Sequence, residues 1–466
     1  MNIDELRELT LSQIAKAIRN DATSPTEIVN LLLEQIRVTD DKVRAYVTIC
    51  KDNALQLAKA AEVQLKSGHD LGPMHGIPVS IKDVLETAGV PTTCCSKLMQ
   101  DYVSEFDSTA VKRLKMAGAF VLGKVTTHEF ALGTVCPPTR NPWKLDCICG
   151  GSSGGSAAAI AASSAIAALG SDTLGSIRIP SSFCGVVGLK PTYSRVSRAG
   201  LIPLSWSLDH VGPITRRVED AALLLSVISG YDQEDPTSSR LPVPDYLHAI
   251  SEGVRGLRIG VPKNYFFDHC EKEVRQTTIS AIDLLEELGC APVEFEFPYV
   301  PEIIAAYTAI EAGEYAAHHE NNIRNRAADY TPDVRTLIEQ ALFIPASRYV
   351  QALRARAMIY PTIVQMFKTF DVIVTPTQPI VAPKSNVEVA NFGDFSEDTS
   401  SATLRYTAPF NLTGLPALSI PCGFSNTGLP IGLQIIGKPF DETTVLRIGL
   451  TYEKATPWHK KFPKIE

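Results

Sequence analysis

Short apolar runs alternate with amphipathic helical runs along most of the 466-residue chain. Near the N-terminus, the capping box Ser24-Pro25-Thr26-Glu27 precedes apolar residues at helical spacing, and a second amphipathic run covers residues 52–66. The apolar, β-branched run 76–83 then predicts a strand that carries Lys82 near its end. Further strands are predicted at 119–123, 185–191, 257–261, 292–297, 370–376, 417–421 and 432–436.

Helical patterns fill most of the space between these strands. They cover residues 107–118, 218–228, 271–288, 301–326, 332–342 and 345–370, and the last is expected to kink or break at Pro361. Segment 382–400 is polar, lacks a clear period and predicts a loop. Strands that alternate with helices predict a layered α/β fold. Because we find no linker or repeat, residues 1–466 are predicted to form one large domain.

Two loops rich in glycine and serine are the most unusual segments of the chain. Residues 150–156 are GGSSGGS and residues 170–176 are GSDTLGS. The alanine-rich stretch between them, from 156 to 169, predicts roughly four turns of helix, and the segment 143–147 before them predicts a loop. Backbone N–H groups in such loops can point at an anion. We therefore expect the loops to bind a phosphate or the oxyanion of an acyl-transfer intermediate.

The hydroxyl groups of these loops allow more than one interpretation. A nucleotide-binding loop needs a lysine followed by Ser or Thr, but Gly155 is followed by Ser156 and Ala157. A Ser–His–acid hydrolase would use Ser153, which lies in a GxSxG pattern, with His210 or His459 as the base. That pattern should come directly after a buried strand. The loop predicted at 143–147 therefore argues against the Ser–His–acid interpretation.

A third interpretation is a serine hydrolase whose base is a lysine. Lysine is a known alternative to histidine for activating a serine hydroxyl. Burial disfavours the ammonium form, so a lysine in a desolvated position can act as a base near neutral pH. Lys82 lies at the end of an apolar run, which makes it the candidate base.

Composition narrows the classes of partner and cofactor. The net charge is −7, from 44 basic and 51 acidic residues, and no basic stripe indicates a nucleic-acid surface. The first residues lack the pattern of a signal peptide, and no run approaches the ~18 apolar residues of a spanning helix. The ten cysteines lack the spacing of a zinc site or a disulfide scaffold. We expect a cytoplasmic protein with reduced thiols, no membrane contact and no metal.

Four motifs in order resemble the amidase signature family. Residues 150–193 are similar to its GGSSGGS loop, small-residue helix, GTDTGGSIR-like loop and FCGxxGLKPT run, and residues 76–83 are similar to its lysine motif. Residues 207–216 and 411–417 also fit. The resemblance implies one layered α/β/α domain with a central mixed β-sheet flanked by helices. Within it, residues 1–70 would be N-terminal helices, 71–220 the catalytic core, and 221–466 the variable substrate pocket with the remaining sheet.

The resemblance also implies an activity: an amidohydrolase that cleaves an amide-type carbon–nitrogen bond of a small molecule, without a cofactor. Ser176 would be the nucleophile, Lys82 the general base, and Ser152 the bridging serine on a cis peptide after Gly151. The oxyanion would meet the backbone N–H groups of Thr173, Leu174, Gly175 and Ser176. Ser153, Asp172 and Arg178 would hold the loops. A twofold homodimer is the expected assembly.

This sequence departs from the family pattern in two places. Leu174 stands where glycine is usual, so we expect an altered substrate shape if the position adopts ordinary backbone angles. The second departure concerns the glutaminase subunits of tRNA-dependent amidotransferases, which hold glutamine with an arginine and an aspartate. In this sequence Arg335 could match the arginine, but the position of the aspartate is Leu404. The loss of that aspartate favours a stand-alone amidase over a glutaminase of this kind. Tyr307 is a further candidate for the substrate pocket.

Overall fold

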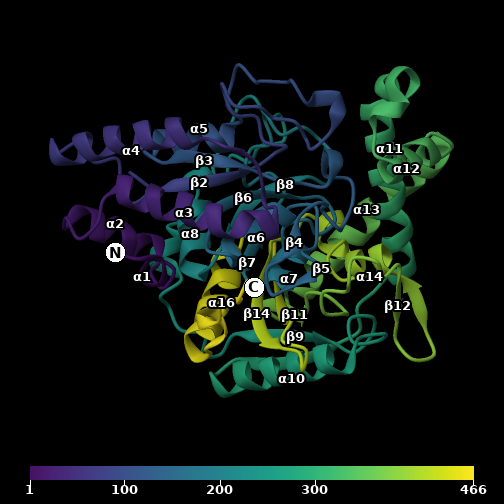
Figure 1. Cartoon of the computed structure of the whole chain (residues 1–466). Helices are drawn as coiled ribbons and strands as arrows, with labels where there is room; N and C mark the ends of the chain where they lie inside the picture. The colour runs from purple at the N-terminus through teal and green to yellow at the C-terminus, as the bar shows by residue number, and fades with distance from the viewer. Residues whose placement is uncertain (466) are drawn as a thin grey trace.

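The computed structural model describes residues 1–465. Its centre is one sheet of eleven strands (Figure 1). In spatial order these are β1 (Tyr46–Ile49), β3 (Phe120–Val125), β2 (Pro78–Lys82), β6 (Ala167–Asp172), β8 (His210–Thr215), β7 (Val187–Lys190), β14 (Ala417–Phe424), β15 (Pro430–Gly437), β11 (Val372–Pro376), β9 (Arg258–Pro262) and β10 (Ala291–Phe295).

Parallel and antiparallel pairs are mixed in this sheet. Strand β2 is parallel to both of its neighbours, β3 and β6, and β9 is parallel to β10 and β11. The other six pairs are antiparallel. They are the pair of β1 with β3 and the five consecutive pairs that lead from β6 through β8, β7, β14 and β15 to β11. The expected α/β fold with a central mixed sheet flanked by helices is confirmed.

Helices lie on both sides of the sheet (Figure 1). The longer ones are α2 (Leu11–Arg19), α3 (Pro25–Val43), α4 (Lys51–Lys66), α5 (Thr109–Met116), α6 (Gly154–Ala161), α7 (Arg178–Cys184), α8 (Val218–Ile228), α10 (Lys272–Glu287), α11 (Val300–Arg326), α12 (Pro332–Ala341), α13 (Ala346–Met366), α14 (Thr399–Arg405) and α16 (Glu442–Ala455). The four-residue helices are α1 (Ile3–Leu6), α9 (Tyr246–Ala249) and α15 (Pro409–Leu412).

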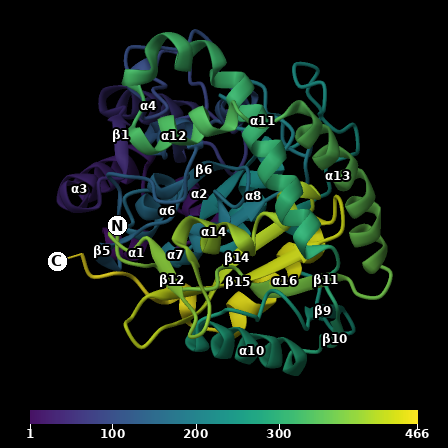
Figure 2. The same cartoon turned by 90° about the vertical axis from the view of Figure 1, so that its right-hand side faces the viewer.

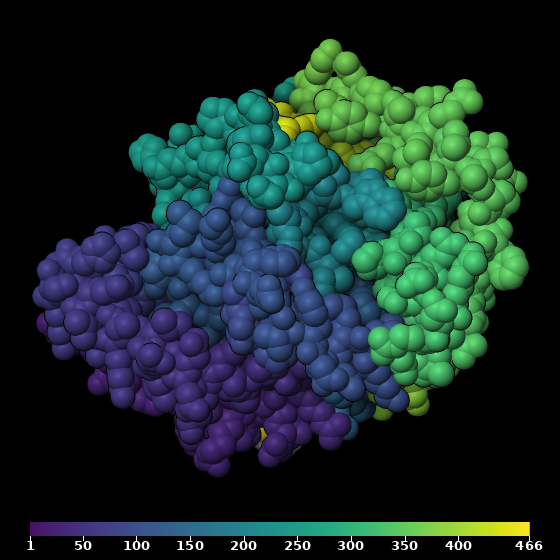
Figure 3. All heavy atoms as spheres, turned by 90° about the horizontal axis from the view of Figure 1, so that it is seen from above, coloured from purple at the N-terminus to yellow at the C-terminus, as the bar shows by residue number. Residues whose placement is uncertain are grey.

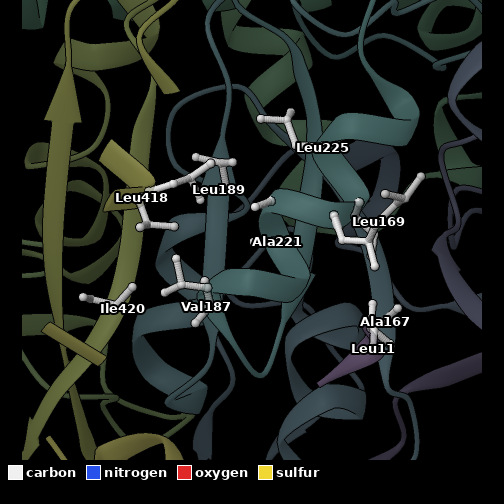
Figure 4. Close-up of a cluster of buried hydrophobic side chains, with 14 of the residues drawn as sticks. Leu11, Ala167, Leu169, Val187, Leu189, Ala221, Leu225, Leu418 and Ile420 are labelled. Atoms are coloured by element: carbon white, nitrogen blue, oxygen red, sulfur yellow. The ribbon is translucent and has the colours of Figure 1, made fainter. Parts of the chain in front are cut away.

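The middle of the sheet is buried on both faces. Figure 4 shows Ala221 and Leu225 of α8 between Leu189 of β7 and Leu169 of β6. Ala168, which lies between Ala167 and Leu169, instead joins the core formed by the alanines of α6. Successive residues of a strand point to opposite faces. Helices α8 and α6 therefore cover opposite faces of β6, which explains why this strand is apolar throughout.

Several local predictions were wrong. The helix expected over 156–169 ends at Ala161, and Ala167–Asp172 is strand β6, because burial between two helical layers overrides the helix propensity of alanine. The loop expected at 143–147 contains β5 (Lys144–Ile148), paired with β4 (Arg140–Asn141). Within the loop expected at 382–400, β12 (Val389–Asn391) and β13 (Ser396–Asp398) form a hairpin. Of the two outcomes expected at Pro361, a kink or a break, the break does not occur, because α13 continues through this residue.

Helices α11, α12 and α13 form a layer beside the second half of the sheet. Helix α11 packs against α12, α13 and the short α15 (Figure 2). Seen from above, the chain near residue 200 lies between the segment near residue 100 and these green helices (Figure 3). The long α11 thus reaches the loops that leave the centre of the sheet.

Candidate active site

Lys82 is the last residue of β2, and the parallel pairing of β2 with β6 brings the ends of both strands together. Its Nζ donates to Ser152 Oγ at 2.7 Å and to Ser171 Oγ at 2.8 Å. Lys82 is fully buried, and no ion pair joins it to any carboxylate within residues 1–465. Burial lowers its pKa to about 8, while the charges of nearby groups, among them Asp172 and Asp209, act in the opposite direction.

Ser152 lies in the loop that leads into α6, and the peptide bond between Gly151 and Ser152 is cis, the geometry that the family resemblance implies. The next residue, Ser153, ties this loop to β6: its Oγ donates to the Ser171 carbonyl at 2.9 Å and accepts from the Ser171 N–H at 3.2 Å. The Ser153 N–H donates to the Ser176 carbonyl at 3.1 Å. The two glycine-and-serine loops are therefore fastened to each other.

Ser176 follows β6 at the turn into α7 and differs from the other serines of the site. It retains 6% exposure, whereas Ser152 and Ser153 have none. Within the described chain its hydroxyl has no hydrogen-bond partner. The N–H groups of residues 173–176 likewise donate to no acceptor among residues 1–465. A reachable hydroxyl beside four free N–H donors is an arrangement that can hold an anion next to a nucleophile.

A buried ion pair shapes the loop between β6 and α7. Asp172 accepts two hydrogen bonds from the Arg178 guanidinium, both at 3.0 Å, and one from the Ile177 N–H at 3.1 Å. Arg178 also donates to the Thr407 carbonyl and to Gln434 Oε1. Burial alone would raise the pKa of Asp172, but the Arg178 charge and hydrogen bonds hold it well below its usual range. The loop is thus held from both ends.

Leu174 fits this loop without backbone strain. It is not among the residues with positive φ, whereas Gly175 has φ of +142°. A Cβ at Gly175 would collide with the Thr407 side chain, so glycine is needed at 175. The Leu174 carbonyl accepts from Thr407 Oγ1 at 2.6 Å. The Leu174 side chain is buried in a core cluster with Tyr307 of α11.

The remaining candidate residues occupy different environments. Tyr307 is buried in a cluster with Leu174, whereas Arg335 is 45% exposed on α12 and pairs with Glu339 at 2.6 Å, and it has no hydrogen bond to the other candidate site residues. His210 is buried, and its two nitrogens lie within hydrogen-bonding distance of Lys190 Nζ and of the Asp172 and Leu208 carbonyls. Neither His210 nor His459 is a hydrogen-bond partner of Ser153. This geometry disfavours the Ser–His–acid interpretation.

Two functional candidates were missed from the sequence. Ser171 is the second hydroxyl partner of Lys82, and the parallel pairing of β2 with β6 is the only signal that could have identified it. Asp209 accepts from Thr173 Oγ1 at 2.6 Å and from the N–H groups of Leu204 and Ser205. Burial raises the pKa of Asp209 to about 6, against the effect of the Thr173 hydrogen bond.

The described residues do not support other common kinds of site. No three His, Cys, Asp or Glu side chains among them are grouped so that they could hold a metal ion. All ten cysteines have free thiols. None of the helices in residues 1–465 combines the length and the apolar character that crossing a membrane requires.

The Amidase family model matches residues 27–446 of the chain. The chain belongs to the amidase signature family. It is 45% identical to an amidase from Pseudomonas putida over 465 residues, which cover 99% of each protein. It is 42% identical to a glutamyl-tRNA(Gln) amidotransferase subunit from Roseiflexus sp., again over 99% of each. A crystal structure of an amidase matches with a TM-score of 0.88 at 31% identity, covering 96% of this chain and 100% of the other.

Proposed function

We propose that this family member is an amidohydrolase that cleaves an amide-type carbon–nitrogen bond of a small molecule through an acyl-enzyme on Ser176. The observation that carries the proposal is the environment of Lys82. It is a fully buried amine whose hydrogen bonds go to two hydroxyls and to no carboxylate within residues 1–465. Since its pKa is lowered to about 8, a useful fraction is neutral near physiological pH.

Lys82 would act as the base through Ser152. The neutral amine takes the Ser152 proton across the 2.7 Å contact while Ser152 takes the proton of Ser176. The Ser176 oxygen attacks the amide carbon to give the tetrahedral intermediate. Ser152 then passes one proton to the leaving nitrogen while Lys82 returns its proton to Ser152, and the C–N bond breaks to release ammonia or an amine. Water then hydrolyses the ester between Ser176 and the acyl group, with Lys82 again as the base.

The free N–H groups of residues 173–176 would stabilise the tetrahedral oxyanion. One such donor contributes about 3 kcal/mol in serine hydrolases where it has been removed. Asp172 and Arg178 would keep these donors aimed, because they hold both ends of the loop. The Leu174 side chain packs away from solvent against the α11 cluster, so it would shape the acyl pocket and leave its own N–H available.

The glutaminase component of a tRNA-dependent amidotransferase is the alternative function, favoured by the 42% identity to a protein of that kind. Leu404 argues against it, because an apolar side chain there gives the α-ammonium of glutamine no partner. The two functions are separated by comparing the rates at which the chain alone hydrolyses glutamine and simple amides.

The direct test is hydrolysis of a panel of primary amides, anilides, ureas and glutamine, with ammonia or amine release as the readout. Ser176→Ala is expected to lower turnover at least about 10³-fold, because it removes the nucleophile and changes one oxygen of a polar loop. Ser280→Ala, at an exposed position on α10, is the matched control and should change nothing. Full activity in Ser176→Ala would overturn the proposal.

A further inference from the structure

One face of α11 is directed at the oxyanion segment and at the loop 205–208, which precedes β8. Tyr307, Glu311 and Glu314 occupy positions i, i+4 and i+7 and so share this face. Tyr307 packs in the same buried cluster as Leu174 and Leu208. Glu314 accepts from Ser205 Oγ at 2.5 Å and from the Ser207 N–H at 3.0 Å. The two neighbours of Glu311 on this face therefore contact the segments 174 and 205–208.

Glu311 is the residue on this face that the fold does not use. Glu314, one turn further along, also accepts from the Tyr349 hydroxyl at 3.1 Å, so both of its oxygens have partners. Glu311 has no hydrogen bond and no ion pair to any of residues 1–465. Its side chain is half-buried, and its carboxyl oxygens are not among the buried atoms that lack a partner, so solvent or a ligand can reach them. A reachable carboxyl group that no other side chain occupies is free to accept hydrogen bonds from a cationic group of a ligand.

The charges around Glu311 indicate what kind of ligand fits. The groups that act on it are Asp209 and Glu314, both carboxylates, and no cation offsets them. Burial, assisted by these two carboxylates, raises the pKa of Glu311 to about 8. Asp209 also accepts from the hydroxyl of Thr173, which belongs to the oxyanion segment. A metal ion is not supported, since no group of three potential ligands is found among the described residues.

We propose that Glu311 determines substrate specificity by binding a cationic group, an ammonium or a guanidinium, on the acyl part of the amide substrate. This inference rests on the proposed function of Ser176. A cation placed between Glu311 and Asp209 relieves the repulsion of the two carboxyl groups and gives Glu311 its missing partner. The Tyr307 side chain and the Leu174 cluster form the apolar wall along which the acyl chain reaches that position.

The test compares amides that differ only at the far end of the acyl chain. β-Alaninamide is paired with butanamide, and longer ω-amino amides are paired with their methyl-ended isosteres. The wild type is expected to prefer the best-fitting amino amide over its isostere by about tenfold or more in kcat/KM, the range of a charged hydrogen bond. Glu311→Gln should raise KM for that substrate about tenfold, leave kcat nearly unchanged, and change the isostere less than twofold.

Glu302→Gln supplies the matched control, because Glu302 is exposed near the start of the same helix. It makes the same Glu-to-Gln change on α11 and should alter neither substrate. Equal kcat/KM for both members of every pair, or an equal effect of Glu311→Gln on both members, would overturn the assignment. Either result leaves the proposed hydrolysis intact, since butanamide and the other isosteres report on it directly.

A binding measurement separates failure of this inference from failure of the proposed function. In the Ser176→Ala background, calorimetric titration is expected to show about tenfold tighter binding of the preferred amino amide than of its isostere, and Glu311→Gln should abolish the difference. If no amide is hydrolysed by the wild type but this difference is found, the cation site stands and the proposed chemistry is wrong. Equal binding of both members would overturn the cation site whatever the turnover.

Discussion

Lys82 and Lys124 occupy two buried sites on neighbouring strands, and they are used in opposite ways. Both are fully buried. In the parallel ladder between β2 and β3, Lys124 pairs with Ile81 and Lys82 with Val125, so the two amines point to opposite faces of the sheet. Lys124 lies 3.2 Å from the Asp83 carboxylate and also donates to Thr92 Oγ1 and the Leu85 carbonyl. Lys82 has two serine hydroxyls instead.

The difference shows that burial alone does not make a lysine a base. Burial lowers the pKa of both amines, but the Asp83 charge acts against this at Lys124 and stabilises its ammonium form. The hydroxyls around Lys82 carry no charge and can relay a proton in either direction. The Lys124 site therefore contributes to the fold, and the Lys82 site is suited to proton transfer. Substitutions at the two sites should separate these roles.

Lys82→Met should have the largest effect on activity. Loss of a general base lowers turnover by about 10²–10⁴-fold at neutral pH. The midpoint of thermal unfolding should change little, because methionine fills the space and no buried carboxylate loses its partner. Turnover numbers and melting curves for purified protein check both statements. Near-normal turnover would contradict the assignment of Lys82 as the base.

Lys124→Met should have the largest effect on stability. It leaves the Asp83 carboxylate buried and unpaired, which costs about 3–5 kcal/mol. Urea unfolding measures the loss, and the double variant Asp83→Asn with Lys124→Met should recover part of it by removing the charge. Turnover per folded molecule should stay within a few-fold of the wild type. A loss of turnover as large as that of Lys82→Met would remove the distinction between the two lysines.

Ser171→Ala should have a smaller effect that reports on Lys82 directly. The Ser171 hydroxyl accepts from the ammonium and so favours the charged form. Its loss should therefore lower the pKa of Lys82 by about half a unit. The rising limb of the pH–rate profile should move to lower pH, and the plateau should fall about fivefold because the amine is less well oriented. An unchanged limb would show that Ser171 does not contact the catalytic form of Lys82.

Much of the fold and the site could be predicted because the signals are local. The strand that ends at Lys82 and the two glycine-and-serine loops are visible in short stretches of sequence, as are helices such as α3 and α10. The alanine-rich stretch misled the prediction, because alanine favours a helix in isolation. Its second half becomes strand β6 only because helices cover both faces.

Residues that depend on distant contacts could not be found in the same way. Ser171 contacts Lys82 only through the pairing of β2 with β6, and Asp209 reaches Thr173 across 36 positions of sequence. The surroundings of Arg335 likewise depend on the fold, which leaves it exposed on α12 and paired with Glu339. Whether Leu174 fits the loop without strain could be judged only from its backbone angles, which neither composition nor spacing supplies.

The central claim is that neutral Lys82 activates Ser176, and the most direct test is the pH dependence of Ser176 labelling by a fluorophosphonate. Intact mass and peptide mapping give the rate and the site without knowledge of the substrate. Because only the neutral amine accepts the proton, the rate should rise with pH through an apparent pKa of about 8 and then level off. In Lys82→Met the rate should be low and lack this transition, whereas Lys124→Met should keep it. Labelling of Ser153, or the same pH profile in Lys82→Met, would contradict the account.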